Sequence, residues 1–243
     1  MKRFILRLLF PLILLIVSIL FAVSSGQFSL SITQIWDTLW HWGSNMTSSD
    51  IVLWNIRLPR IATAILVGIA LSTAGVTYQG MFKNPLVSPD ILGVTAGAGL
   101  GAVVAIYFDF PLMLIQCFAF IGGLTAVSLV YFIASTVRRQ NPILALVLSG
   151  VAISTLLGAG ISLLKILADP YSQLSTITFW LLGGLNMTSF EDLKFVAPLV
   201  LIAMLPLILL RWRMNVLSLD DEEAQALGIN LTRTRLIFIL GLT

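Results

Sequence analysis

The sequence predicts an all-α integral membrane protein, a polytopic bundle of transmembrane helices. Of its 243 residues, 58% are hydrophobic and only 10% are charged, and the mean hydropathy is +1.01. A soluble domain has about a quarter of its residues charged, so no water-soluble packing could hide this much apolar surface. The apolar residues gather in runs of about 20, the length that crosses a hydrocarbon core of ~30 Å. No run alternates polar and apolar residues as a β-barrel strand does, which favours helices.

Six runs meet or approach the length of a span, because an α-helix rises ~1.5 Å per residue. They are Phe4–Ser24, Ile61–Phe82, Ile91–Phe108, Pro111–Ser135, Pro142–Leu167 and Leu193–Leu210. A seventh run begins at Arg235 and stops at Thr243, so we expect six complete spans and a partial seventh. The shorter run Leu174–Met187 contains Gly183 and Gly184 and is predicted to be re-entrant or interfacial.

The first run has an alternative interpretation as a secretory signal peptide. It begins with basic residues, and Ala22-Val23-Ser24 resembles a cleavage site. Its apolar stretch exceeds the ~7–15 residues of a signal peptide. We therefore interpret it as an uncleaved first span.

Lysine and arginine predict the orientation of these spans, because they concentrate on the cytoplasmic side of membrane proteins. With the amino terminus inside, ten basic residues fall on the cytoplasmic side and four on the outer side. The ten are Lys2, Arg3, Arg7, Lys83, Arg138, Arg139, Arg211, Arg213, Arg233 and Arg235, and the four are Arg57, Arg60, Lys165 and Lys194. This orientation leaves Arg57 and Arg60 on the side where arginine is disfavoured.

Small residues recur at helical spacing within three of the runs. Such rows let helix backbones approach closely in lipid, where hydrophobicity does not drive association. We predict tight helix packing at Gly68 and Gly75, at Gly93, Gly97 and Gly101, and at Gly150 and Gly158.

Several kinds of chemistry are disfavoured by composition. His41 is the only histidine and Cys117 the only cysteine, which argues against zinc, haem and catalytic-triad sites, so no metal or catalytic residue is predicted. The cores of the runs carry no Asp, Glu or His, which argues against a proton-coupled carrier. An ion-coupled secondary transporter that uses backbone carbonyls stays open. The sequence has no G-x-x-x-x-G-K-[ST] motif, so ATP would have to bind a separate subunit.

Four ordered segments resemble one known family. "RLPR" before a glycine-bearing run, "YQGMFKNPLVSPDILGVTAGAGLGA", "WLLGGLNMTSFEDLKFV" and "LSLDDEEAQALGINLTRTR" look like the permease subunits of ABC importers for iron chelates, haem and cobalamin, the FecCD type. The resemblance covers nearly the whole chain. Members of that family have about ten spans, so it implies a single, incomplete permease domain over residues 1–243, truncated at its carboxy terminus and unable to transport alone.

The resemblance implies a docking role for Arg57 and Arg60. In the family, the arginines of the RLPR motif face outward and receive acidic side chains of a substrate-binding protein. Two guanidiniums around Pro59, spaced for one helical turn, suit bidentate contacts with carboxylates. The alternative is that both arginines only anchor the helix at the interface.

A cytoplasmic coupling loop is implied over residues 211–235. Ser218 or Asp220 can cap a short helix there, Ala224 and Leu227 are expected to share one face, and Gly228 can end the helix in a left-handed conformation. The family implies that this helix contacts the ATPase subunit. The residues assigned to coupling are Asp220, Asp221, Glu222, Glu223, Ala224, Leu227 and Gly228. A solvated charged loop is the alternative.

Two cytoplasmic turns pair asparagine with proline, which gives rigid polar turns. The family places a gate there, with Asn84, Pro85, Gln140 and Asn141 as candidates. Ordinary turn chemistry explains each residue equally well.

The function implied is the membrane-spanning permease of a binding-protein-dependent ABC importer, not an enzyme, in the bacterial cytoplasmic (inner) membrane. Its cargo is expected to be a ferric siderophore or another iron chelate, although relatives carry haem, cobalamin or molybdate. Its expected partners are an ATP-binding subunit that holds ATP and Mg²⁺, a periplasmic or lipid-anchored binding protein, a second permease subunit in a homo- or heterodimer, and lipid. No cofactor on this chain and no nucleic acid partner is expected. The alternative is an ion-coupled secondary transporter.

Overall fold

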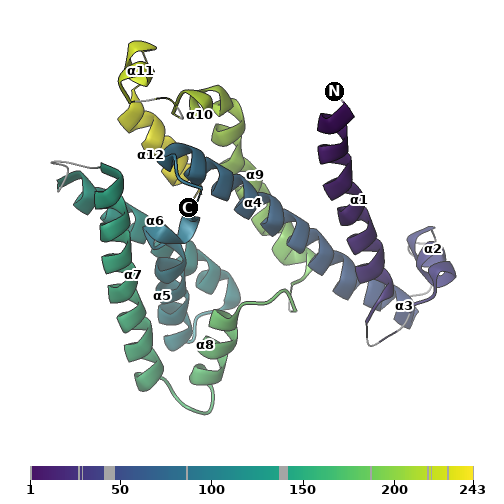
Figure 1. Ribbon diagram of the computed structural model, residues 1–243. Helices are drawn as coiled ribbons and strands as arrows, with labels where there is room; N and C mark the ends of the chain where they lie inside the picture. Colours follow the sequence, from purple (N-terminus) through teal and green to yellow (C-terminus); the bar gives the residue numbers. More distant parts are fainter. Residues whose placement is uncertain are drawn as a thin grey trace. The chain divides into compact units, whose positions relative to one another are not determined.

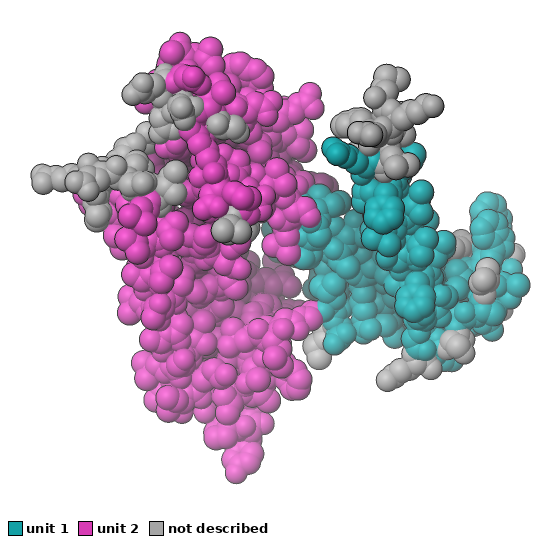
Figure 2. Space-filling view, viewed as in Figure 1, with its two compact units in different colours: residues 1–69, 185–200 teal, residues 70–184, 201–243 magenta. Residues whose placement is uncertain are grey.

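A computed structural model describes residues 2–26, 28, 30–40, 47–85, 87–136, 142–186, 188–217, 219, 221–228 and 230–242. Within these ranges the chain is helical and has no strand (Figure 1). It forms two compact units: residues 1–69 with 185–200, and residues 70–184 with 201–243 (Figure 2). The helices α4 (Leu58–Phe82) and α9 (Phe190–Leu209) each contribute residues to both units.

The first unit contains α1 and the segments that lead into α4. Its elements are α1 (Lys2–Ser24), α2 (Ile32–Trp40), α3 (Ser48–Asp50), the π-helical turn η1 (Ile51–Arg57) and the first halves of α4 and α9. Its core is small: Val23, Leu30 and Leu53 are buried, and Ile19 and Ile35 pack against them. The end of α1, the turn after it, α2 and η1 therefore meet in one apolar cluster.

The second unit holds the remaining elements, and two apolar clusters form its core. The elements of this unit are η2 (Pro89–Leu92), α5 (Val94–Tyr107), α6 (Leu112–Thr136), α7 (Pro142–Leu167), α8 (Gln173–Leu182), α10 (Arg211–Leu217), α11 (Asp221–Ala226) and α12 (Leu231–Leu242), with the second halves of α4 and α9. The larger cluster includes Tyr78, Val130, Leu217 and Phe238, and the smaller one includes Val103 and Ile177.

Four helical stretches among the described residues are long and apolar enough to cross a membrane. They are Ser48–Phe82, Leu112–Thr136, Leu144–Leu167 and Phe190–Leu209. The side chains on their outer faces are largely apolar and exposed, for example Leu129, Leu156 and Ile202. Apolar surface of this extent requires lipid around it.

The predicted run Ile91–Phe108 is not one continuous helix. Gly93 has a φ of +76°, in the left-handed region, and separates η2 from α5. A residue with this backbone ends a helix, and glycine adopts it without steric cost. As a result α5 has 14 residues, a rise of only ~21 Å.

Candidate functional site

Arg57 lies at the end of η1, and its side chain points into the first unit. Only 8% of its surface is exposed. Its guanidinium donates from Nη1 to the carbonyl of Val23 and from Nη2 to the carbonyl of Phe28. The first of these carbonyls ends α1 and the second belongs to the turn before α2.

Arg60 lies one turn further along, in α4, and is only half-buried. Its Nη2 donates to the carbonyl of Asn186 at 2.5 Å. Its Nε is buried and has no hydrogen-bond partner among the described residues. Of the two arginines, Arg60 is therefore the one with side-chain surface available to a partner.

The turn that carries Arg57 is π-helical, and α2 packs beside it. The Leu58 N–H donates to the Leu53 carbonyl, a five-residue spacing. Trp54 donates from Nε1 to the Thr38 carbonyl of α2 at 3.5 Å, and its ring lies 6.5 Å from that of Phe190. Single π-turns in helices occur often at functional sites. No sequence pattern predicted a role for α2 or Trp54.

The coupling segment forms the three short helices α10, α11 and α12. The helix α11 begins with the backbone of Asp221 and Glu222. Within it Glu223 is exposed and Ala224 is fully buried. Gly228 has the left-handed backbone that the sequence predicts, with a φ of +76°. Asp220 and Ser218 lie outside the described residues.

Ala224 and Leu227 do not share a face. The helix α11 ends at Ala226, so Leu227 follows its last residue and is 56% exposed. Ala224 instead belongs to the buried cluster that includes Leu217 and Leu231. Leu227 is thus an apolar side chain on the surface of this segment.

One of the two candidate gate turns is described. Asn84 and Pro85 are exposed, the Asn84 N–H donates to the Gln79 carbonyl at 3.2 Å, and Lys83 before them has a φ of +52°. The Val87 N–H closes the turn on the Asn84 carbonyl at 3.3 Å. Gln140 and Asn141 lie outside the described residues.

The glycine rows differ in what lies against them. A Cβ at Gly97 or Gly101 would overlap the α6 backbone at Gly122 or Phe118, and one at Gly150 would overlap the Ile91 carbonyl. A Cβ at Gly93 would lie 3.0 Å from the Ser154 hydroxyl. Gly68, Gly75 and Gly158 have nothing within 4 Å of an added Cβ.

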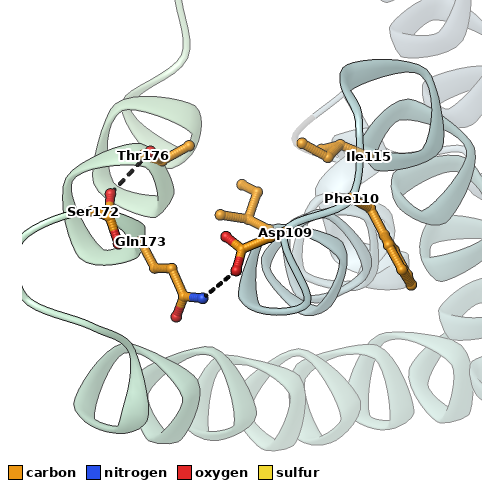
Figure 3. Close-up of a pocket in the computed structure, with 7 residues that line it drawn as sticks. Asp109, Phe110, Ile115, Ser172, Gln173 and Thr176 are labelled. Carbon is orange, nitrogen blue, oxygen red and sulfur yellow. Dashed lines mark hydrogen bonds between the residues drawn. The ribbon is translucent and has the colours of Figure 1, made fainter.

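A small pocket of about 200 Å³, lined by both polar and apolar side chains, lies at the turn between α5 and α6, beside the start of α8. Gln173 donates from Nε2 to the Tyr107 carbonyl at 3.0 Å. The same nitrogen donates to the Asp109 carboxylate at 3.1 Å (Figure 3). Asp109 has a φ of +54°, in the left-handed region. No sequence pattern predicts this contact, because Asp109 and Gln173 are 64 positions apart and match no motif.

No group of three or more metal-ligating side chains occurs among the residues that the structure describes. The residues that sequence reasoning selected form separate sites. Arg57 and Arg60 belong to the first unit, whereas the coupling helices and the turn at Asn84 belong to the second.

Comparisons with known proteins agree on one family. Residues 14–243 match the model of the FecCD transport family. The chain is 37% identical over 241 residues to the molybdate import system permease protein MolB of Haemophilus influenzae, with 97% of this chain and 71% of that protein covered. It is 35% identical to the hemin transport system permease protein HmuU of Yersinia pestis, with 95% and 69% covered.

A solved structure of a metal-chelate type ABC transporter in an inward-facing conformation has the same fold. Its TM-score is 0.81 at 35% sequence identity, and the match covers 97% of this chain and 73% of that one. The match thus covers about 70% of the length of each of these three relatives. It belongs to the FecCD transport family and is a permease subunit of an ABC importer.

Proposed function

We propose that this permease carries a metal chelate, most specifically a ferric siderophore or another iron chelate, inward across the bacterial cytoplasmic membrane. Family membership over residues 14–243 is the observation that carries the proposal. Two of the similar proteins are named for hemin and for a metal chelate, and one is named for molybdate. The ion-coupled secondary transporter is set aside, because an ABC importer draws its energy from ATP.

The assembly we propose is a homo- or heterodimer of permease subunits with two ATP-binding subunits and an external binding protein. ATP and Mg²⁺ belong to the ATP-binding subunits. The described helices are compatible with six complete spans and a partial seventh within residues 1–243, with the 23-residue α1 as the first and the interrupted pair η2 and α5 as the third. The basic-residue bias supports an amino terminus in the cytoplasm. Residues 1–243 then belong to a single permease domain and form part of it.

Docking of the binding protein is assigned to the outer end of α4, around Arg57 and Arg60. Arginine is unexpected on the outer side of a membrane protein unless it has a specific role. Arg60 is partly exposed and can meet a carboxylate, and the positive charge of the buried Arg57 lies one turn away.

Coupling to the ATPase is assigned to residues 211–235. The sequence of the short α11 begins with acidic residues, which the helix dipole favours at that end. The exposed Leu227 then supplies an apolar contact for a groove on the ATP-binding subunit. The gate is assigned to the turn at Asn84 and Pro85 and to Gln140 and Asn141.

Uptake in reconstituted vesicles tests the cargo. The permease would be expressed from its full genomic reading frame and assembled with the ATP-binding subunit and binding protein of its own source, and ATP would be supplied on the cytoplasmic side. We expect ATP-dependent uptake of a ⁵⁵Fe-labelled siderophore in excess of uptake of hemin, cobalamin or molybdate. Uptake of molybdate alone would contradict the iron-chelate cargo but not the importer assignment.

A further inference from the structure

Arg57 uses its guanidinium inside the protein, not at its surface. Both terminal nitrogens donate to main-chain carbonyls, those of Val23 and Phe28, and 8% of the residue is exposed. A bidentate contact with a partner's carboxylate would need the same fork of N–H groups. The arginine therefore cannot serve such a carboxylate while it holds these two carbonyls.

The turn after α1 is shaped around this guanidinium. Gly26 lies between the two accepting carbonyls, and a Cβ there would lie 2.7 Å from the Arg57 Nη2. The backbone of Gly26 has a φ of +155°, which side-chain-bearing residues rarely adopt. Glycine at position 26 thus admits the guanidinium into the turn.

The surroundings make this contact costly to lose. Leu53, one helical turn before Arg57, is fully buried against Val23 and Leu30. Removal of the guanidinium would take this donor away from the Val23 carbonyl, which lies beside the apolar cluster. Buried backbone carbonyls are almost always hydrogen-bonded, because an unpaired one pays its full desolvation cost.

We propose that Arg57 is a positioning residue that clamps the turn between α1 and α2 onto the start of α4, and that direct ionic contact with the binding protein falls to Arg60. The assignment of ionic contact to Arg60 rests on the docking role proposed above, whereas the clamp role of Arg57 does not. Arg57 then acts on docking only through the shape of the surface that α2 and the turn present.

Mobility of the turn tests the clamp without any partner. The only cysteine, Cys117, would be replaced by alanine, and the exposed Ser25 would be replaced by cysteine and spin-labelled in the chain reconstituted in lipid nanodiscs. Arg57→Met keeps an apolar stem but removes the donors, and Arg60→Met is the matched control. Gly26→Ala displaces the guanidinium without changing any charge.

We expect the mobile population of the label to rise at least about tenfold in Arg57→Met, as loss of hydrogen bonds to a charged group predicts. Gly26→Ala should give a comparable rise, Arg60→Met none, and the double variant Gly26→Ala/Arg57→Met no more than either alone, because both remove the same contact. A label that is no more mobile in Arg57→Met than in Arg60→Met, or additive effects of the two substitutions at 26 and 57, would overturn the clamp.

Docking is then measured with the binding protein of the same source organism at several salt concentrations. Removal of a direct ionic contact weakens the salt dependence of association, whereas removal of a positioning residue leaves that dependence unchanged. We expect Arg60→Met to flatten the salt dependence of association and Arg57→Met to leave its slope unchanged. A flattened slope in Arg57→Met would overturn the division of roles. If Arg60→Met does not change association with the binding protein, the docking role of Arg60 is rejected. The clamp role of Arg57 is still decided by the mobility of the spin label.

Discussion

Among single residues, Tyr78 brings a hydroxyl into the apolar core of the second unit. Its side chain is fully buried and stacks on Phe82, and the hydroxyl has no hydrogen-bond partner among the described residues. A buried unpaired polar group costs about 1–3 kcal/mol. We predict that Tyr78→Phe leaves the thermal stability of the purified permease unchanged or raises it.

Tyr78→Ala is the comparison, because it also removes the ring. Loss of a buried aromatic side chain typically costs about 3–5 kcal/mol. Unfolding followed by near-UV circular dichroism in detergent would measure both variants. A destabilised Tyr78→Phe protein would mean that the hydroxyl has a partner in the working state.

The predicted orientation and the resemblance of the RLPR motif gave Arg57 and Arg60 the same docking role and did not predict that the two residues differ. Both stand near Pro59 on the same side of the predicted membrane. Their difference depends on where the chain after α1 returns, since the carbonyls bound by Arg57 come from positions 23 and 28. No local pattern around position 57 contains that information.

At the scale of elements, the contact between α5 and α6 depends on glycine. The backbones approach so closely that a Cβ at Gly101 would overlap the Phe118 carbonyl. We predict that Gly101→Val lowers the free energy of unfolding by about 1–3 kcal/mol, the usual cost of overpacking. Gly158→Val, where nothing lies within 4 Å of an added Cβ, should change the stability of the single subunit little. Thermal unfolding in detergent compares the two, and equal losses would contradict the close approach.

The short helix α2 is predicted to lie at the membrane surface. Trp36 and Trp40 are 64% and 76% exposed, and their rings stack at 5.7 Å, while Ile35 packs inward on the first unit's core. Tryptophan favours the headgroup layer of a bilayer. We expect lipids brominated near the headgroup to quench these two residues more than lipids brominated near the chain end. The difference between wild type and Trp36→Phe/Trp40→Phe isolates their signal, and deeper or absent quenching would reject the prediction.

The coupling segment gives a third element-scale prediction. Leu227→Arg places a charge at the exposed apolar position that follows α11. We expect the ATP-binding subunit to co-purify in at least about tenfold lower yield, because a desolvated unpaired charge costs several kcal/mol. Gln225→Arg, an exposed polar position in the same helix, is the matched control. Normal assembly and normal ATP-driven transport in Leu227→Arg would favour a merely solvated loop.

For the whole molecule, the proposed orientation places the turn at Asn84 inside and the turn at Tyr171 outside. Both residues are exposed, Tyr171 at 96%. In a Cys117→Ala background, a membrane-impermeant maleimide should label Tyr171→Cys but not Asn84→Cys in intact spheroplasts. Lysis should make Asn84→Cys reactive. The reverse labelling pattern would invert the topology.

Hydropathy and length were enough to predict most of the helices. The predicted run Pro142–Leu167 coincides with α7, and Pro111–Ser135 differs from α6 by one residue at each end. The break at Gly93 was missed because the run stays apolar through it. The break lies where the Ile91 carbonyl closely approaches Gly150, and hydropathy does not predict such a tertiary contact. The helix α2 was missed because at nine residues it is too short to register as a span.

The length of α5 has a consequence for how the chain is made. A newly synthesised segment leaves the translocation channel for lipid when it is long and apolar enough to stay there, and ~21 Å of helix falls short of a ~30 Å core. The next helix, α6, has 25 residues and meets α5 through facing glycines. The two should therefore leave the channel together as a hairpin, so that α5 becomes a membrane helix only after the ribosome has completed α6.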